Sequence, residues 1–180
     1  MTTVTPLALA EVLHITPTRH GDARGWFAET WNRKALLAAG VDTQFVQDNQ
    51  AFNAKKGTVR GLHFQKAPHS QGKLVRVLKG AIFDVAVDVR QGSPTWGRWV
   101  GATLTAETGE QLWVPRGFAH GYMTLTDDTE LSYKVDGDYA PALEGGLIWN
   151  DPDIGIAWPL DVAPLLSEKD KVLPRLKDMP

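Results

Sequence analysis

The chain has no cysteine among its 180 residues. This absence excludes disulfide bonds, a thiolate nucleophile and a cysteine-ligated zinc site, and it agrees with a reducing compartment. Net charge is also small, because 19 basic and 21 acidic residues leave a formal charge of −2. We therefore expect no electrostatic attraction to nucleic acid or to an anionic membrane.

Long hydrophobic runs are missing too. No uninterrupted apolar stretch approaches the roughly 20 residues that a membrane helix needs. The first eleven residues lack the basic start and apolar centre of a secretory signal. A chain of this length can bury a sizeable core within one domain. We expect a cytoplasmic protein with a single domain over residues 1–180.

Helical patterns are scarce. Trp31–Ala39 consists of good helix formers and is followed by Gly40, a typical C-terminal residue. Pro164–Asp170 resembles a short turn or a one-turn helix. Because helices do not alternate with strands, a doubly wound α/β fold is disfavoured.

Short strand patterns dominate instead. In Ala81–Arg90, apolar residues alternate with a second face that carries Asp84 and Asp88. Lys79-Gly80 is a turn signal that joins this strand to the preceding one. The other expected strands are Leu74–Leu78, Trp99–Thr105, Gln111–Val114, Gly121–Leu125 and Glu130–Val135. Many short strands at this spacing predict a β-sandwich or barrel.

The two aspartates of this strand need separate interpretations. An isolated strand Asp is more often solvated than buried. Polar residues at nearby strand-like positions nevertheless favour a polar interior around Asp84; they are His63, Gln65, Lys73 and Arg76. Asp88, close to the strand end, is expected on the surface.

His63 is the residue with the clearest potential for chemistry. A lone His beside apolar residues is commonly a packed or surface imidazole. Metal-binding cupins use His-x-His, and here the spacing gives His63-Phe64-Gln65. His69 and His120 could contribute ligands, but no carboxylate has a convincing spacing, so a metal site is disfavoured. A functional His63 would therefore transfer protons, a task that suits an imidazole near neutral pH.

At these residues the sequence resembles the dTDP-4-dehydrorhamnose 3,5-epimerase family, over almost the whole chain. Each motif is weak alone, but their order and spacing together are specific. The motifs are Asp22–Glu29, Gln47–Asn49, Gly57–Gln65, Gly72–Val77, Asp84–Asp88, Ser93–Thr95, Pro115–Gly121, Tyr133-Lys134, Trp149–Pro152 and Ser167–Asp170.

The resemblance implies an all-β fold, a cupin-type jelly-roll barrel with a few short peripheral helices. It also implies a homodimer that works without a metal or another cofactor. The substrate would be dTDP-4-dehydro-6-deoxy-D-glucose, inverted at C3 and C5 to give dTDP-4-dehydro-L-rhamnose for dTDP-L-rhamnose biosynthesis. Both carbons lie beside the C4 ketone, so enolate formation acidifies their protons.

The same resemblance assigns catalytic roles. His63 is expected to be the base, oriented by Asp170, in the manner of other base–carboxylate pairs. Tyr133 is expected to be the acid on the opposite face, and Lys73 to stabilise the O4 enolate. Without the resemblance, Asp170 and Lys73 would be read as surface charges and Tyr133 as a core residue.

Substrate-binding roles follow from the resemblance as well. Arg24 and Arg60 have forked donors that suit a diphosphate. The nucleotide and sugar would also contact residues from several motifs, of which Arg24, Phe27 and Glu29 are expected to act across the dimer interface. The predicted binding set is Arg24, Phe27, Glu29, Gln47, Asn49, Arg60, Asp84, His120, Tyr139 and Lys169.

Two departures from the family pattern concern recognition. His20 stands where many members carry an aromatic residue that stacks on thymine. Gln50–Asn53, expected to be a loop at the pocket mouth, replaces the usual His and Ser residues. Three alternatives stay open: an epimerase of C3 or C5 alone, a metal-dependent cupin, and a non-catalytic sugar-binding or structural barrel.

Overall fold

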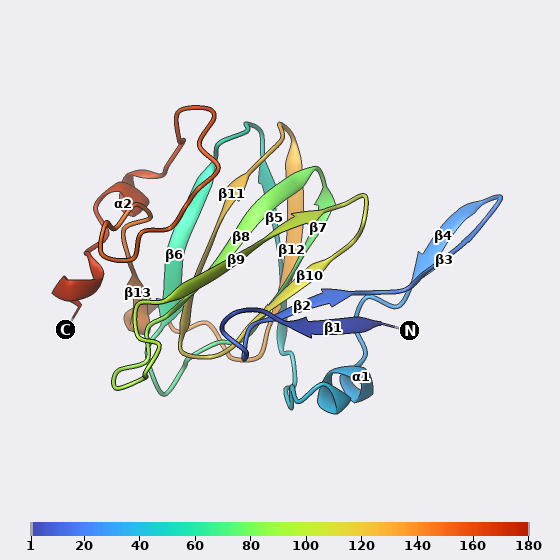
Figure 1. Ribbon diagram of the computed structural model, residues 1–180, viewed down its shortest axis with the longest axis horizontal. Helices are drawn as coiled ribbons and strands as arrows, with labels where there is room; N and C mark the ends of the chain where they lie inside the picture. Colours follow the sequence, from blue (N-terminus) through green and yellow to red (C-terminus); the bar gives the residue numbers. More distant parts are fainter. Residues whose placement is uncertain (1, 180) are drawn as a thin grey trace.

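A computed structural model describes residues 2–179 and contains two antiparallel β-sheets that face each other (Figure 1). The six-stranded sheet has the order β1-β2-β10-β7-β12-β5, and the five-stranded sheet has the order β13-β6-β11-β8-β9. The strands of the six-stranded sheet are β1 (Thr3–Pro6), β2 (Leu13–Thr16), β10 (Gln111–Val114), β7 (Lys73–Lys79), β12 (Thr129–Val135) and β5 (Gln47–Asn53). Those of the other sheet are β13 (Glu144–Gly146), β6 (Val59–Gln65), β11 (Phe118–Thr124), β8 (Ala81–Asp88) and β9 (Trp99–Thr105). The predicted jelly-roll barrel is confirmed.

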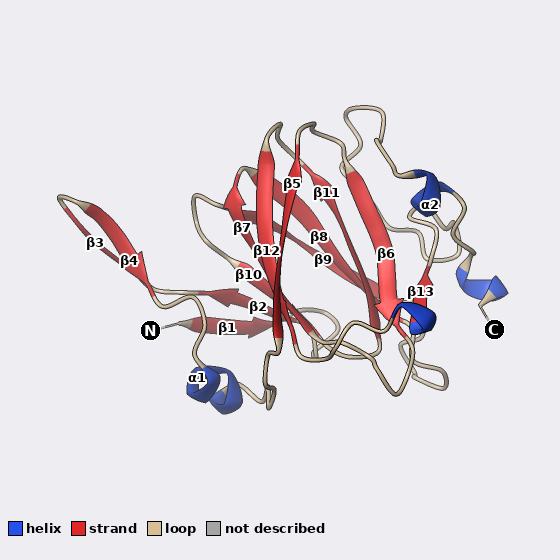
Figure 2. Cartoon of the chain, turned by 180° about the vertical axis from the view of Figure 1, so that it is seen from behind, coloured by secondary structure: helices blue, strands red, loops and turns tan. Residues whose placement is uncertain are grey.

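Helices are few and peripheral, also as predicted (Figure 2). They are α1 (Arg33–Ala38), α2 (Glu168–Lys171) and the 3₁₀ turns η1 (Pro141–Leu143) and η2 (Leu176–Asp178). The side chain of Asn32 caps the start of α1. No helix within residues 2–179 is long and apolar enough to cross a membrane.

The core has layers on both sides of the sheets. Between the two sheets, apolar side chains such as Val75, Ile82 and Leu112 form the barrel interior. Behind the five-stranded sheet, Val85 and Val87 pack in a second cluster together with residues of the C-terminal segment, including Leu147, Ile154, Trp158 and Leu176. Strand β8 is therefore covered on both faces, and the C-terminal segment is held against the sheet.

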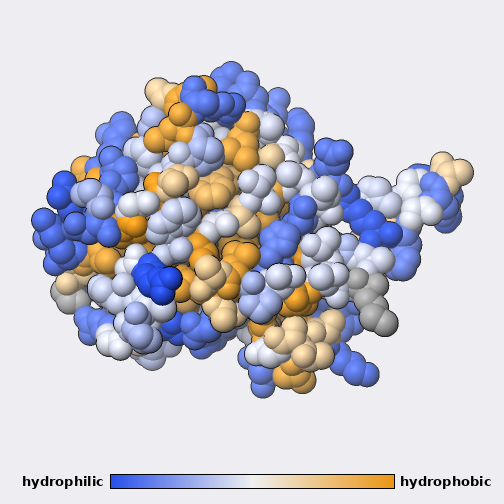
Figure 3. Space-filling view, viewed as in Figure 1, coloured by the Kyte–Doolittle hydropathy of each residue, from blue (hydrophilic) through white to orange (hydrophobic). Residues whose placement is uncertain are grey.

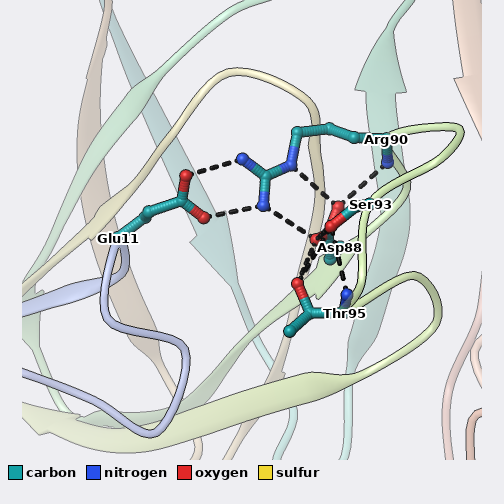
Figure 4. Close-up of polar contacts among 5 residues, drawn as sticks. All are labelled: Glu11, Asp88, Arg90, Ser93 and Thr95. Carbon is teal, nitrogen blue, oxygen red and sulfur yellow. Dashed lines mark hydrogen bonds and ion pairs between the residues drawn. The ribbon is translucent and has the colours of Figure 1, made fainter.

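Two sequence predictions are wrong in this region. Asp88 is completely buried rather than on the surface. It accepts hydrogen bonds from Arg90, Ser93 and Thr95, and Arg90 also pairs with Glu11 (Figure 4). The loop after β8 folds back over the strand end and covers the carboxylate, which a local strand pattern does not reveal.

Arg76 is the second correction. It was expected in the polar interior with Lys73, but the two residues are three positions apart and therefore lie on opposite faces of β7. The Arg76 side chain donates to the Ser132 hydroxyl. It lines a groove on the outer side of the six-stranded sheet.

The hairpin of β3 (Arg19–Asp22) and β4 (Gly25–Ala28) stands away from both sheets as an arm. Figure 3 shows it projecting from the body of the molecule. At its base, Arg19 donates to the carbonyl oxygens of Ala106 and Glu107 and lies over the Trp26 ring, 3.9 Å from its centroid. The direction of the arm is thus fixed by contacts with the barrel.

Candidate active site

Two adjoining pockets, of about 430 Å³ and about 300 Å³, open between the sheets and share His63, Lys73, Tyr133 and Lys169 in their walls. A larger cleft of about 760 Å³ lies beside α1. Its buried carboxylate, Asp136, is already hydrogen-bonded to Thr43, Gly72 and Arg116. The chemically equipped cavity is therefore the pair of pockets between the sheets.

His63 is placed in this cavity by an unusually close strand contact. A Cβ atom on Gly61 would lie 2.7 Å from the His120 carbonyl oxygen and 2.9 Å from the Gly121 Cα. Gly61 also has φ of 108°, a conformation that favours glycine. This approach of β6 to β11 puts His63 and His120 directly opposite each other in the register.

Asp170 reaches His63 from the far end of the chain. The His63 Nε2 atom lies 2.7 Å from Asp170 Oδ1, and the Asp170 residue is only 3% exposed. The other carboxylate oxygen accepts from the Gly61 backbone N–H at 3.5 Å. Ser167 caps α2 by accepting from the Asp170 backbone N–H. Since Asp170 holds Nε2, the Nδ1 atom is the ring nitrogen left to act on a bound molecule.

The charge state of His63 reflects opposing influences. Burial lowers its pKa from the usual 6.5, while the charge and hydrogen bond of Asp170 oppose that change. The nearby Lys73 and Lys169 favour the neutral ring further. A neutral imidazole with one nitrogen held by a carboxylate is suited to accept a proton near pH 7.

Lys73 is a partly buried cation beside the His63–Asp170 pair. Its Nζ atom lies 3.4 Å from the His63 carbonyl oxygen. Burial lowers the pKa of Lys73 to about 8, against the attraction of Asp84 and Glu144. An ammonium in this position can stabilise negative charge that develops on a bound molecule.

A second His–carboxylate pair supports this wall. His120 Nε2 lies 2.7 Å from Asp84 Oδ1, and Asp84 is completely buried. Asp84 was predicted to bind substrate in the polar interior, and the interior position is what the structure has. Its side chain lies behind the pocket wall, however. It acts on the cavity by holding His120 and by its negative charge, which opposes the lowering of the Lys73 pKa.

Tyr133 and Arg60 complete the wall of the larger of the two pockets, of about 430 Å³, which we call the inner pocket. Burial raises the pKa of Tyr133, while the positive charge of Arg60 opposes the rise. Tyr133 is therefore a protonated hydroxyl near neutral pH, as a proton donor must be. The Arg60 guanidinium is held by Asn53, whose Oδ1 accepts from Nε at 2.8 Å.

The smaller pocket, of about 300 Å³, which we call the outer pocket, has a polar rim. Gln47 donates to Asn49 at 2.7 Å, and both line the cavity. On the other side, Glu144 accepts from the Tyr139 hydroxyl at 2.9 Å and from Lys169 at 2.6 Å. This link joins η1–β13 to α2 across the pocket entrance.

The residues of the arm are not brought to this cavity. Arg24 pairs with its neighbour Asp22, Phe27 is 72% exposed, and Glu29 accepts from Asn32 near α1. His20 also lies on the arm. Within one chain, therefore, the predicted site divides into a pocket group and a separate arm group.

Sequence reasoning missed two pocket residues and one buried residue beside the pocket, and it misread one segment. Glu144, Tyr122 and Asn53 were not singled out, although Glu144 links the rim and Tyr122 lines the inner pocket. Gln50–Asn53 belongs to strand β5 rather than to a loop. Gln50 therefore points to the outer side, where it bonds Glu130, whereas Asn53 is buried beside Arg60.

Taken together, the jelly-roll barrel and the His–Asp pair define a cupin-type protein whose interior carries acid–base groups. Within residues 2–179, no group of three His, Cys, Asp or Glu side chains is arranged to hold a metal ion. The chain belongs to the dTDP-4-dehydrorhamnose 3,5-epimerase family, whose model matches residues 6–178.

Individual relatives agree with this membership. The dTDP-4-dehydrorhamnose 3,5-epimerase of Sinorhizobium fredii is 54% identical, over 97% of this chain and 89% of the relative. The structure of dTDP-6-deoxy-D-glucose-3,5-epimerase from Legionella pneumophila, in complex with dTDP-4-keto-L-rhamnose, has a TM-score of 0.96 and 40% identity, over 100% of this chain and 95% of that one. The structure of ChmJ, a 3'-monoepimerase from Streptomyces bikiniensis in complex with dTDP-quinovose, has a TM-score of 0.89 and 38% identity, over 96% and 87%.

Proposed function

We propose that this protein converts dTDP-4-dehydro-6-deoxy-D-glucose to dTDP-4-dehydro-L-rhamnose, by inversion at C3 and C5, in dTDP-L-rhamnose biosynthesis. The observation that carries the proposal is the His63–Asp170 pair, which shares one cavity with Tyr133 and Lys73. Family membership and the sugar nucleotides bound to its structural relatives support the choice of substrate.

In this reaction His63 Nδ1 removes the proton from the carbon beside the C4 ketone. The electron pair moves to O4 as an enolate, and the ammonium of Lys73 stabilises that charge. Asp170 stabilises the imidazolium that forms and keeps the second proton of the ring on Nε2. Tyr133 then protonates the carbon from the opposite face, which inverts its configuration. Once His63 has released its proton to solvent and Tyr133 has taken one up from solvent, the same two proton transfers at the second carbon complete the double epimerisation.

The substrate's other contacts follow from the two groups of residues. Arg60 and His120 are proposed to bind the diphosphate and sugar in the inner pocket. Gln47, Asn49, Tyr139 and Lys169 are proposed to bind at the rim. Because the C-terminal segment supplies Asp170 to His63 of β6, the chain is proposed to act as a single epimerase domain.

A homodimer completes this proposal. Arg24 and Phe27 lie on the arm and Glu29 follows it directly, and none of the three lines the pocket of its own chain. The arm's exposed Trp26 and Phe27 side chains suit burial against a second copy, where they would close the nucleotide end of the partner's pocket. Sedimentation equilibrium tests the assembly: a dimer is expected, and a monomer with full activity would refute this role of the arm.

Deuterium incorporation tests the reaction itself. The protein is incubated with dTDP-4-dehydro-6-deoxy-D-glucose in deuterated water, and the product is analysed by NMR. Deuterium at both C3 and C5 with the L-lyxo product is expected, and His63→Ala should show no incorporation. The second candidate is an epimerase of one carbon only, which the similarity to the ChmJ monoepimerase favours. Label at a single carbon would establish that candidate and refute the double epimerisation.

A further inference from the structure

Asn53 is a buried polar residue next to the proposed substrate pocket, and the mechanism does not use it. It ends strand β5 and is only 2% exposed. Its Oδ1 atom accepts from Arg60 Nε at 2.8 Å and from the Tyr122 hydroxyl at 3.4 Å. Its Nδ2 atom donates to the Thr129 carbonyl oxygen at 3.3 Å. Because Arg60 can only donate, the amide must turn its oxygen toward the guanidinium.

Arg60 differs from several other arginines of the chain in what holds it. Arg24, Arg90 and Arg116 each lie within 4.0 Å of a carboxylate oxygen. Among residues 2–179, the Arg60 guanidinium pairs with no carboxylate; it donates to Asn53 and, at 3.5 Å, to the Phe52 carbonyl oxygen, and it lines the inner pocket. A neutral amide therefore holds a cation that faces the cavity.

We propose that Asn53 is a positioning residue for substrate recognition, because it fixes the Arg60 guanidinium toward the pocket without neutralising its charge. The ligand class is the diphosphate of a nucleoside diphosphate, whose oxygens match a forked guanidinium. The inference rests on the proposed function. A carboxylate at position 53 would fix the same group but would cancel the charge that binds the anion. A residue that is only apolar would leave the charge but release the side chain.

The first test compares Asn53→Ala with the wild type by calorimetric titration of dTDP. Loss of a pre-organised contact is expected to raise the Kd for dTDP roughly tenfold, and to raise KM similarly while kcat changes little. Asn53→Asp is expected to weaken dTDP binding at least as much, because its carboxylate forms an ion pair with Arg60. Wild-type affinity for dTDP in Asn53→Asp would overturn the proposal that the side chain at position 53 must be uncharged.

A double-variant cycle separates this role from a purely structural one. If Asn53 acts through Arg60, Asn53→Ala should cause no further loss of dTDP affinity in an Arg60→Ala background. Additive losses would overturn the proposal. Should Asn53→Ala be too unstable to assay, Asn53→Ser carries the same expectation, because its shorter side chain does not reach Arg60 Nε.

Thr124→Val provides the matched stability control. Thr124 is also buried, and its hydroxyl donates to the Lys55 carbonyl oxygen at 2.8 Å and accepts from the Thr58 N–H at 3.0 Å. This variant should lower Tm but leave dTDP affinity unchanged; an equal loss of affinity would mean that general destabilisation explains the Asn53 effect. Wild-type protein that neither binds dTDP nor epimerises would refute the proposed function. Wild-type protein that does both while Asn53→Ala matches it would refute the Asn53 proposal alone.

Discussion

Replacing Asp170 by Asn tests the central contact of the site with almost no change in shape. The carboxylate is 3% exposed and faces two donors, the His63 ring at 2.7 Å and the Gly61 backbone N–H at 3.5 Å. An amide presents one oxygen and one NH₂ group, so it can accept from only one of them. If its NH₂ group turns to His63, the ring must carry its proton on Nδ1 and can no longer act as the base there.

The size of the effect follows from two losses. A hydrogen bond to a charged group contributes about 1.5–3 kcal/mol, which corresponds to roughly 10- to 100-fold in stabilising the imidazolium. The altered tautomer adds to this, and in the comparable Ser-His-Asp triad the same change costs roughly 10⁴-fold in kcat. We therefore expect kcat to fall by about 10³- to 10⁴-fold. Because Asp170 does not contact the nucleotide in the proposed mechanism, the Kd for dTDP should stay close to that of the wild type.

The assay measures kcat by NMR and dTDP affinity by calorimetry on the same preparation. Glu168→Gln is the matched control, since Glu168 lies on the same short helix with its side chain 91% exposed. It should retain wild-type kcat. A decrease of less than tenfold in Asp170→Asn, or an equal loss of dTDP affinity, would show that Asp170 does not orient the base.

Three further predictions concern protonation and folding. Because burial lowers the pKa of Lys73 to about 8, kcat/KM should fall as pH rises above 8, and Lys73→Arg should remove this decline; a decline that persists would exclude Lys73 as its cause. Tyr133→Phe should lower kcat by roughly 10²- to 10⁴-fold and disturb product stereochemistry, so wild-type product by NMR would refute the acid role. Burial alone would raise the pKa of Asp88, but hydrogen bonds from Arg90 and two hydroxyls lower it, so its stabilising contribution is present at neutral pH and is lost as pH falls. Asp88→Ala should therefore lower the free energy of unfolding at pH 7 by roughly 3 kcal/mol in urea titrations, and an unchanged urea midpoint would contradict this.

The six strands expected from the sequence correspond to β7–β12, whereas β2 and β6 were not predicted although both are largely buried. Trp99–Thr105 and Gln111–Val114 were predicted with the bounds of β9 and β10. Strand β5 and the arm were missed because their residues are mostly polar or exposed, so neither shows the alternation that burial imposes. Pairing with a neighbouring strand, rather than a local hydrophobic pattern, determines their conformation.

The site was predictable only in part from local patterns. His63 could be singled out by its chemistry, but no spacing rule connects it to Asp170, which lies 107 positions later in the chain. Only the resemblance to the family supplied that partner. Asp88 was misplaced because its hydrogen-bond donors come from the loop that folds back after the strand, and Asn53 was overlooked because its partner Arg60 lies on the other sheet.

The docking of the C-terminal segment has a consequence for how activity is lost. The segment is joined by the bridge between Leu165 and Thr58, the residue just before β6, and Trp158 and Leu176 anchor it behind the five-stranded sheet. Segments of this kind can open without unfolding of the whole domain. Opening would withdraw Asp170 from His63 while the barrel stays folded. Mild denaturant should thus abolish turnover, and accelerate amide exchange in residues 164–176, before the far-ultraviolet circular dichroism of the β-sheets reports global unfolding.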